Sequence, residues 1–310
     1  MGNIFYFSFE PALMQWIQEM VGQTGARVLS QISALGEEAV MVLVLGFLYW
    51  CYDKEFGIFV GTNASIAIVM NPLIKNIALR VRPYMVHEGI KCIRPVDPSG
   101  DIYDITVQGY SFPSGHSMNS AVVYGSLARY GKKKILTVLG FILPLLIGFS
   151  RVTAGVHYPT DVLTGWAVGA AVIFLFPYIY EKFGRQKRWI LNLIIFLISS
   201  LGLFYCRTTD YFTGLGIMGG FFAGIEFEER FVKFESTKKP GIMALRLIGG
   251  LAIFAVLNTL IKLPFSEEFL NSATMSAFVL RFVRYMVVLF LLIGVYPYTF
   301  GLFSGKKKPE

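Results

Sequence analysis

Charged side chains are scarce in this sequence. Only 15% of the 310 residues are Asp, Glu, Lys or Arg, whereas 55% are hydrophobic, and the mean hydropathy is +0.57. Soluble globular domains carry roughly 25% charged residues, so this composition excludes an ordinary water-soluble protein. Most of the chain must therefore be surrounded by a lipid bilayer.

Cysteine is also rare. The three cysteines, Cys51, Cys92 and Cys206, have neither the spacing of a metal site nor the pattern of a disulfide framework. Cys92 and Cys206 could pair if both faced outward, but we expect unpaired buried thiols. Carboxylate clusters and His/Cys groups are missing too, so no metal ion and no other cofactor is expected.

No cleavable signal peptide is expected at the N-terminus. The first twenty residues lack a basic start and contain Glu10 and Glu19. Apolar side chains instead recur at helical spacing, which predicts an amphipathic helix on the outer interface of the membrane. A short first span is the alternative. These apolar residues are Leu13, Trp16, Ile17, Met20 and Val21.

Long uncharged runs recur along the whole chain. A helix needs about 17 to 25 residues to cross a hydrocarbon core, and flanking Lys and Arg side chains extend the shorter runs to the interface. The runs predict an all-α, polytopic transmembrane helix bundle of about nine spans plus the N-terminal interfacial helix. The predicted spans are residues 38–52, 57–74, 113–129, 135–150, 162–180, 189–206, 211–225, 247–261 and 285–304.

No linker and no repeat divides the sequence, so we expect one membrane domain with a functional division inside it. Residues 1–35 are the interfacial segment, residues 36–206 the catalytic membrane core, and residues 207–310 additional C-terminal transmembrane helices. The longest outer connection, residues 82–112, contains several Pro and Gly residues and is predicted to be a lid or a binding element.

The net charge of +8 does not indicate nucleic-acid binding, because the basic residues lie in short loops between hydrophobic runs. If the chain begins outside, every inner segment is basic, as the positive-inside rule expects. The motifs described next then lie on the extracytoplasmic or lumenal side. The inner basic residues are Lys54, Lys132, Lys133, Lys134, Lys182, Arg185, Lys187, Arg188, Lys238, Lys239, Lys306, Lys307 and Lys308.

The first motif contains Lys75 and Arg82 at the end of the second predicted span. On a continuous helix they would lie two turns apart and about 20° short of full register. Both side chains could then point at one anion. Basic residues that extend to the interface from a helix end would give the same pattern.

The second motif is Pro-Ser-Gly-His at residues 113–116. Proline suits a first helical turn, which would leave the amides of Ser114 and Gly115 without intrahelical partners and pointing outward as an anion site. His116 lies one turn in, near enough to donate a proton to a phosphate oxygen. Alternatively, His116 is a polar residue at a helix start whose hydrogen bonds are made within the protein and which has no role in catalysis.

The third motif is the most specific. Ser-Arg at residues 150–151 is followed after five residues by His157 and then by Asp161. Pro159 predicts that a helix starts here, with His157 in the preceding turn and Asp161 in the first turn. The carboxylate can hold one ring nitrogen of His157 and leave the other free for nucleophilic attack. Alternatively, Asp161 only complements the helix dipole.

Together the motifs supply three cations, two histidines and backbone donors. A phosphate monoester carries about −1.5 to −2 near neutral pH, so Lys75, Arg82 and Arg151 can bind it and retain positive field for the transition state. Phosphoryl transfer needs little beyond positioning and electrostatics. The three motifs therefore indicate phosphate-ester chemistry.

The three motifs resemble the signature of the type 2 phosphatidic acid phosphatase superfamily. The resemblance implies that His157 forms a phosphohistidine, that Asp161 supports it, and that His116 protonates the leaving alcohol and later activates water. It also implies that the phosphoryl oxygens are bound by Lys75, Arg82, Ser114, Gly115 and Arg151. The order of motifs and spans is similar to that of glucose-6-phosphatases and sphingosine-1-phosphate phosphatases.

We therefore expect an integral, multi-pass membrane phosphatase that needs no metal, is inhibited by vanadate and hydrolyses the phosphate monoester of a lipid. A soluble sugar phosphate or a polyprenyl pyrophosphate is the alternative substrate. A catalytically silent lipid transporter or scaffold is the alternative function. The expected partners are the phosphate-ester substrate and membrane lipids, and the sequence indicates no oligomeric state.

Overall fold

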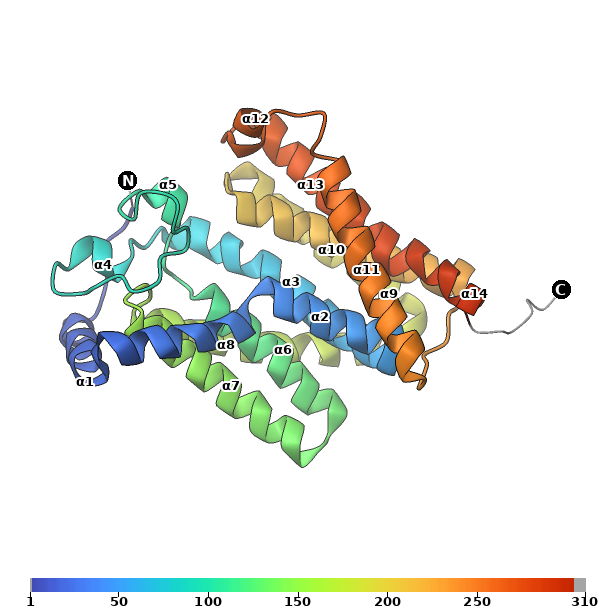
Figure 1. Ribbon diagram of the computed structural model, residues 1–310, viewed down its shortest axis with the longest axis horizontal. Coiled ribbons are helices and arrows are strands. Elements are labelled where there is room, and N and C mark those ends of the chain that lie inside the picture. The colour runs from blue at the N-terminus through green and yellow to red at the C-terminus, as the bar shows by residue number, and fades with distance from the viewer. Residues whose placement is uncertain (1, 304–310) are drawn as a thin grey trace. The chain divides into compact units, whose positions relative to one another are not determined.

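The computed structural model describes residues 2–303 and is built from helices (Figure 1). Within that range, extended pairing is limited to a single bridge between Asn3 and Arg80. The all-α prediction is therefore confirmed. The basic tail predicted at residues 306–308 lies outside the described residues.

The chain divides into two compact units. The first comprises Met1–Met41 and Met70–Leu175, and the second comprises Val42–Val69 and Phe176–Glu310. Every residue of the three motifs belongs to the first unit. None of the three cysteines forms a disulfide; Cys51 and Cys206 are buried as expected, whereas Cys92 is only partly buried.

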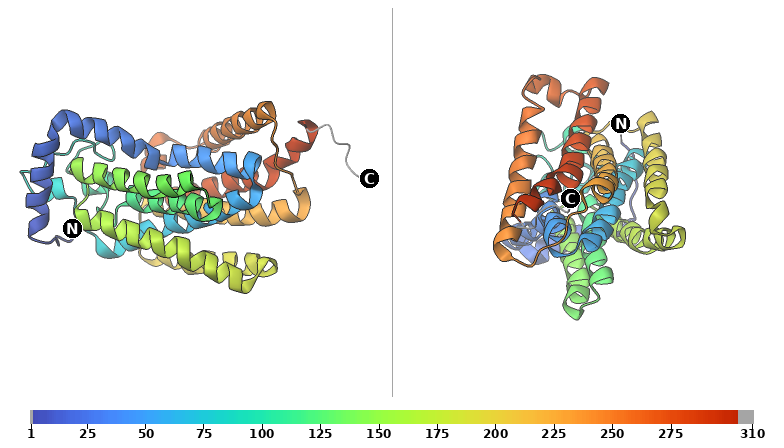
Figure 2. Two further views of the ribbon diagram at one scale, coloured as in Figure 1. Left: turned by 90° about the horizontal axis from the view of Figure 1, so that it is seen from below. Right: turned by 90° about the vertical axis from the view of Figure 1, so that its right-hand side faces the viewer.

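In the first unit, α6, α7 and α8 run side by side, and the first turns of α1 lie across one end of them (Figures 1 and 2). Small residues allow this close packing. A Cβ on Gly165 of α8 would lie 2.8 Å from the Ser114 carbonyl oxygen, and one on Gly140 of α7 would lie 2.8 Å from Cβ of Ala128 in α6. The helices of this unit are α1 Phe9–Ile32, the end of α3 Lys54–Ala78, α4 Pro83–Val86, α5 Ile105–Gln108, α6 Gly115–Gly131, α7 Lys134–Thr153 and most of α8 Pro159–Phe183.

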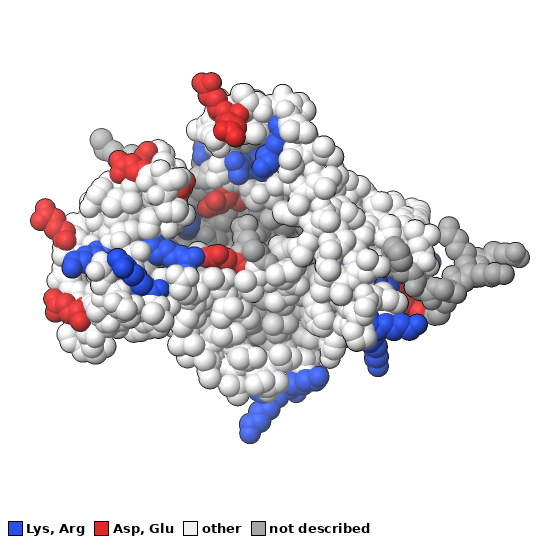
Figure 3. Space-filling model, in the orientation of Figure 1, with Lys and Arg blue, Asp and Glu red and all other residues white. Residues whose placement is uncertain are grey.

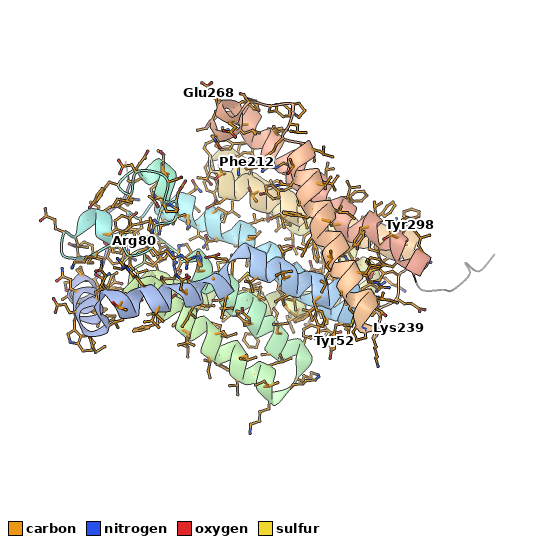
Figure 4. All side chains as sticks on the ribbon, in the orientation of Figure 1. Tyr52, Arg80, Phe212, Lys239, Glu268 and Tyr298 are labelled. Atoms are coloured by element: carbon orange, nitrogen blue, oxygen red, sulfur yellow. The ribbon has the colours of Figure 1, made fainter. Side chains whose placement is uncertain are left out.

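In the second unit, α10 and α13 pack closely because α10 carries glycines. A Cβ on Gly216 would lie 2.5 Å from the Phe282 carbonyl oxygen. Phe212 of α10, labelled in Figure 4, stacks on Phe278 of α13 with ring centroids 4.9 Å apart. The further helices are α2 Glu38–Phe47, which crosses the boundary between the units, α9 Arg188–Ser200, α10 Thr209–Phe227, α11 Pro240–Leu260, α12 Glu267–Asn271, α13 Met275–Phe290 and α14 Phe300–Phe303. Short 3₁₀ or π-helical turns lie at Ser33–Gly36, Leu48–Tyr52, Arg185–Lys187, Leu201–Phe204, Glu228–Val232, Leu291–Val295 and Tyr296–Thr299.

Seven helical segments among the described residues are long and apolar enough to cross a membrane. Large parts of the face shown in Figure 3 carry no charged side chain. The two other predicted spans form α6 and α10, which are not among the seven. A polytopic helical membrane protein is confirmed, and the count of nine spans stays a prediction. The seven segments are Phe9–Tyr52, Lys54–Ala78, Lys134–Thr153, Pro159–Phe183, Arg185–Phe204, Pro240–Leu260 and Met275–Leu302.

The predicted apolar face of the N-terminal helix is divided between the core and the surface. Met14 and Ile17 of α1 are 0% and 8% exposed and belong to the same apolar cluster as Tyr158. Trp16 and Met20 are exposed. α1 therefore packs directly against the third motif, and its position at the membrane interface stays a prediction.

The connection at residues 82–112 folds on itself around Gln108, which is 1% exposed. The Gln108 side chain donates from Nε2 to the Asp97 carbonyl over 2.8 Å and accepts at Oε1 from the Val96 amide over 2.9 Å. Arg94 forms an ion pair of 2.5 Å with Glu37. Within this connection only the four-residue helices α4 and α5 are helical, and its role as a lid or binding element stays a prediction.

Candidate active site

The three motifs lie at one end of the first unit. They are carried by the C-terminal ends of α3 and α7 and by the N-terminal ends of α6 and α8, beside α1 and the connection at residues 82–112 (Figure 1). Two backbone hydrogen bonds join the segments that carry the motifs. The Ser111 amide donates to the Arg80 carbonyl, and the Ser114 amide donates to the Asp161 carbonyl.

The continuous helix predicted from Lys75 to Arg82 is wrong. α3 ends at Ala78, Leu79 adopts a left-handed φ of 53°, and Arg82 is extended with a ψ of 148°. Pro83 explains the extended conformation, because its ring disfavours helical geometry in the preceding residue. Lys75 and Arg82 therefore reach the site from a helix and from an extended segment, and helical register does not relate them.

Arg82 is 2% exposed and binds backbone carbonyls on two segments. Its Nε lies 3.0 Å from both the Gln108 and the Gly109 oxygens, and its Nη2 lies 2.8 Å from the Gln108 oxygen. Its Nη1 lies 3.0 Å from the Val156 oxygen. These charge-assisted bonds tie the connection at residues 82–112 to the turn that carries His157.

Ser114 caps α6 and is fully buried. Its Oγ accepts from the Ser117 amide, and its own amide donates to the Asp161 carbonyl over 3.0 Å. The prediction that the Ser114 amide points outward is therefore wrong, because the start of α8 packs directly on the start of α6. Gly115 and His116 hold the first two helical positions, whose amides have no intrahelical acceptor.

Gly115 lets α3 approach the start of α6. A Cβ there would lie 3.2 Å from Oδ1 of Asn71, and Nδ2 of Asn71 donates to the Pro113 carbonyl over 3.2 Å. The half-buried His116 lies beside Gly36, where an added Cβ would be 3.6 Å from Cδ2 of the ring.

α8 begins at Pro159 as predicted, which places His157 in the preceding turn and Asp161 in the first helical turn. The two side chains are buried, and Nδ1 of His157 lies 3.4 Å from Oδ2 of Asp161. Within the described residues, Nδ1 has no hydrogen-bond partner. Oδ2 of Asp161 also accepts from the Tyr158 amide over 2.8 Å. The carboxylate thus faces the ring, and a small shift would bring the pair within hydrogen-bonding distance.

Arg151 has a buried donor that lacks a protein acceptor. The side chain is 2% exposed, and its Nη1 lies 3.3 Å from Oγ of Ser33. Its Nε is buried without a hydrogen-bond partner in the described part of the chain. Buried polar groups are rarely left unpaired, so this donor suits a bound anion.

The positive charges of the three segments act on one ring. Burial, followed by the charges of Arg82, Arg151 and Lys75, lowers the pKa of His157 well below its ordinary value. The ring is therefore neutral at physiological pH, which is the nucleophilic form of an imidazole. The three cations predicted to share one anion lie close enough to influence the same histidine.

Two buried charged residues beside Asp161 are not identified by the sequence analysis. Arg80, labelled in Figure 4, is 1% exposed, and its Nη1 lies 2.6 Å from Oδ1 of Asp161. Its Nη2 lies 3.0 Å from Oε2 of Glu10, which is 0% exposed. The sequence does contain a signal for Arg80, because this residue is a further positive charge between Lys75 and Arg82 of the first motif. Glu10 gives no such signal, because it lies far away in α1 and contacts the site only in the folded chain.

The site combines a neutral imidazole, several cations and a carboxylate behind the imidazole. No group of three or more His, Cys, Asp or Glu side chains that could share a metal ion occurs among residues 2–303. The arrangement can bind an anion and attack it with a ring nitrogen, which are the requirements of covalent group transfer.

Two family models match the chain. One is described as the PAP2 superfamily and matches residues 55–185. The other is described as the transmembrane extension of PAP2 superfamily phosphatases and matches residues 212–308. All the predicted site residues lie within the first match.

Proteins of similar sequence are named as phosphatases. Phosphatidylglycerophosphatase B of Bacillus subtilis is 29% identical over 52% of this chain and 78% of its own length. A decaprenylphosphoryl-5-phosphoribose phosphatase of Mycolicibacterium smegmatis is 30% identical over 46% of this chain and 70% of its own length. An undecaprenyl-diphosphatase of Sulfolobus acidocaldarius is 30% identical over 46% of this chain and 65% of its own length. The crystal structure of a transmembrane PAP2 type phosphatidylglycerolphosphate phosphatase from Bacillus subtilis is 23% identical, with a TM-score of 0.38, over 57% of this chain and 98% of that chain.

Proposed function

The chain belongs to the PAP2 superfamily and is an integral membrane phosphatase, and on this basis we propose that it hydrolyses the phosphate monoester of a lipid through nucleophilic attack by His157. The observation that carries the proposal is the buried ring of His157, whose Nδ1 lies 3.4 Å from Oδ2 of Asp161 and whose pKa is lowered by burial and by the charges of Arg82, Arg151 and Lys75. The names of the relatives, which refer to lipid phosphates, support a lipid as the substrate class.

In the proposed reaction, Nε2 of His157 attacks phosphorus, and the bond from phosphorus to the ester oxygen breaks. Asp161 faces Nδ1 and stabilises the positive charge that develops on the ring. His116 donates a proton to the leaving oxygen. Water then attacks the phosphohistidine, His116 takes the proton, and the phosphorus–nitrogen bond breaks to release phosphate.

The phosphoryl oxygens are proposed to bind at the start of α6 and among the cations. Lys75, Arg82 and Arg151 supply positive charge, and Nε of Arg151, which is buried without a hydrogen-bond partner among the described residues, supports its part in this role. The Gly115 amide at the first position of α6 and the Ser114 hydroxyl supply further donors.

A polyprenyl pyrophosphate is the second candidate substrate, because one relative is named undecaprenyl-diphosphatase. A soluble sugar phosphate is a further alternative. A catalytically silent transporter or scaffold, the alternative function, is not supported, because the chain belongs to a family of phosphatases and carries both His116 and His157.

We further propose that the site faces the extracytoplasmic or lumenal side, because the predicted inner loops carry the clustered basic residues. We also propose the division into the interfacial segment 1–35, the catalytic core 36–206 and the C-terminal helices 207–310. The start of the transmembrane-extension match at residue 212 supports the last boundary.

The test is phosphate release by the purified protein. At least one substrate should be hydrolysed from a panel of phosphatidic acid, sphingosine-1-phosphate, phosphatidylglycerophosphate, undecaprenyl pyrophosphate and glucose-6-phosphate. Release should persist in chelator and stop with vanadate. His157→Ala should abolish it, whereas His87→Gln, which changes a histidine outside the motifs, should retain most of it. Activity that disappears with chelator or survives in His157→Ala would overturn the proposal.

A further inference from the structure

A chain of buried ionic contacts runs from the N-terminal helix to His157. Oε2 of Glu10 lies 3.0 Å from Nη2 of Arg80, and Nη1 of Arg80 lies 2.6 Å from Oδ1 of Asp161. Oδ2 of Asp161 lies 3.4 Å from Nδ1 of His157. Arg80 is therefore placed between two carboxylates, of which Asp161 faces the histidine.

Thr160 closes this network. Its amide and its hydroxyl donate to Oε1 of Glu10 over 2.9 and 2.7 Å, and its hydroxyl accepts from Nη1 of Arg80 over 2.8 Å. The Phe7 amide donates to Oε2 of Glu10 over 2.9 Å. Glu10 is thus fixed by donors from three segments, and it holds the first turn of α8 one residue before Asp161.

The residues that precede α1 fix Arg80 from the other side. Asn3 exchanges backbone hydrogen bonds of 2.7 and 3.0 Å with residues 79–81. The guanidinium of Arg80 lies 3.9 Å from the ring centroid of Tyr158 and 4.7 Å from that of Phe5. Cation–π contacts of this kind restrict the orientation of the guanidinium. The N-terminal segment therefore forms part of the wall behind the site.

The charge count of this network contributes to the field at His157 alongside the charges of Arg82, Arg151 and Lys75, because water does not screen it. Glu10, Arg80 and Asp161 are 0%, 1% and 0% exposed. Interactions between buried charges are much stronger than those between surface charges. Two carboxylates and one guanidinium leave one net negative charge, whereas Arg80 and Asp161 alone would be neutral.

We propose that Glu10 and Arg80 are positioning residues for the reaction at His157, and that Glu10 offsets Arg80 so that one full negative charge remains behind the histidine. This inference rests on the proposed phosphohistidine chemistry. When Nε2 bonds to phosphorus the ring becomes cationic, and an uncompensated negative charge beside Nδ1 stabilises that state. Arg80 meanwhile holds the Asp161 carboxylate in one orientation. In metal sites, residues that do not touch the metal orient the residues that bind it in a similar way.

Removing the two charges should move the pKa of His157 in opposite directions. Glu10→Gln leaves the network neutral and should lower the pKa of His157 further. Arg80→Gln leaves two negative charges and should raise it. The other titratable or charged groups that face the ring are unchanged in both variants: Lys75 on α3, Arg82 after α3, His116 on α6 and Arg151 on α7.

NMR titration of histidine-labelled, full-length protein in detergent micelles measures this pKa without catalysis. The chain has three histidines, so His157→Gln identifies the resonance of His157. The expected order of the pKa is Arg80→Gln highest, wild type next and Glu10→Gln lowest. Equal values, or shifts of the same sign, would overturn the proposal. If Arg80→Gln does not fold, the double variant Glu10→Gln/Arg80→Gln replaces it, because it restores one negative charge and should return the pKa close to the wild-type value.

Phosphate release from the best substrate of the panel is the second measurement. Glu10→Gln should lower kcat roughly 10- to 100-fold, the usual cost of losing an outer-shell partner, with little change in KM. Glu19→Gln is the matched control, because Glu19 is exposed on the same helix. A kcat of Glu10→Gln equal to that of the control contradicts the positioning role. If the wild-type protein hydrolyses none of the substrates, the proposed function is wrong. The order of the His157 pKa values measured by NMR then still tests whether Glu10 offsets the charge of Arg80.

Discussion

Nδ1 of His157 lies 3.4 Å from one oxygen of Asp161, while Arg80 binds the other oxygen of the same carboxylate. Asp161 is thereby held in the first turn of α8 with one edge toward the ring. A residue that only complements the helix dipole needs no such contact. The geometry therefore favours an orienting role for Asp161 over a dipole role.

Asp161→Asn tests this distinction. If Asp161 orients and stabilises His157, the substitution should lower kcat by roughly 10⁴-fold, as the same substitution of the orienting carboxylate does in the serine protease triad. Asp210→Asn is the control, because Asp210 is an exposed acid in the first turn of α10. Steady-state phosphate release measures both. Similar kcat values for the two variants would support the dipole role.

The pKa of His157 should also influence stability. Burial and the neighbouring cations lower this pKa in the folded protein, whereas the unfolded chain has the ordinary value of about 6.5. The unfolded state therefore binds the proton first, and the folded state loses stability as the pH falls from about 6.5 toward the lowered pKa. Thermal unfolding at several pH values should show a Tm that falls less steeply on acidification in His157→Gln than in the wild type. Parallel curves would show that His157 is not held neutral.

Most of the third motif was predictable from the sequence, because Pro159 fixes where α8 begins and local spacing then places His157 and Asp161. The conformation of the first motif was not predictable, because Leu79 adopts a left-handed backbone conformation that nothing about a leucine residue indicates. Glu10 could not be found either. Its role depends on contacts with residues about seventy and about one hundred and fifty positions away, and spacing along the chain reports only neighbours on one element.

Arg151 should contribute to the reaction mainly by binding the phosphate or vanadate anion. Its buried Nε lacks a protein partner within residues 2–303, and a hydrogen bond to a charged group is worth about 1.5 to 3 kcal/mol. Arg151→Gln should therefore weaken inhibition by vanadate roughly 10- to 100-fold. Arg230→Gln is the control, because Arg230 is exposed and paired with Glu226. An unchanged inhibition constant in Arg151→Gln would remove Arg151 from the anion site.

The side of the membrane can be tested with introduced cysteines. Ser99 is exposed in the connection at residues 82–112, and Lys133 is exposed between α6 and α7. Cys92 is a poorer probe, because burial raises the pKa of its thiol and reduces the reactive thiolate. In a Cys92→Ser background, an impermeant maleimide should label Ser99→Cys in intact cells and Lys133→Cys only after lysis. The reverse pattern would place the site on the inner side.

Gly155 should be indispensable for the turn that carries His157. It has a φ of 77°, and an added Cβ would lie 2.2 Å from the Lys91 carbonyl oxygen. Gly155→Ala therefore combines left-handed strain of roughly 1 to 2 kcal/mol with a backbone clash that no rotamer change relieves, so both Tm and kcat should fall. Gly22→Ala reports the strain of a positive φ without a clash, because Gly22 has a φ of 68° and a ψ of 165°, a region open almost only to glycine, and no described atom lies within 4 Å of an added Cβ. If both variants lost the same Tm, the strain alone would account for the loss, and the connection at residues 82–112 would have to move away from the added methyl group.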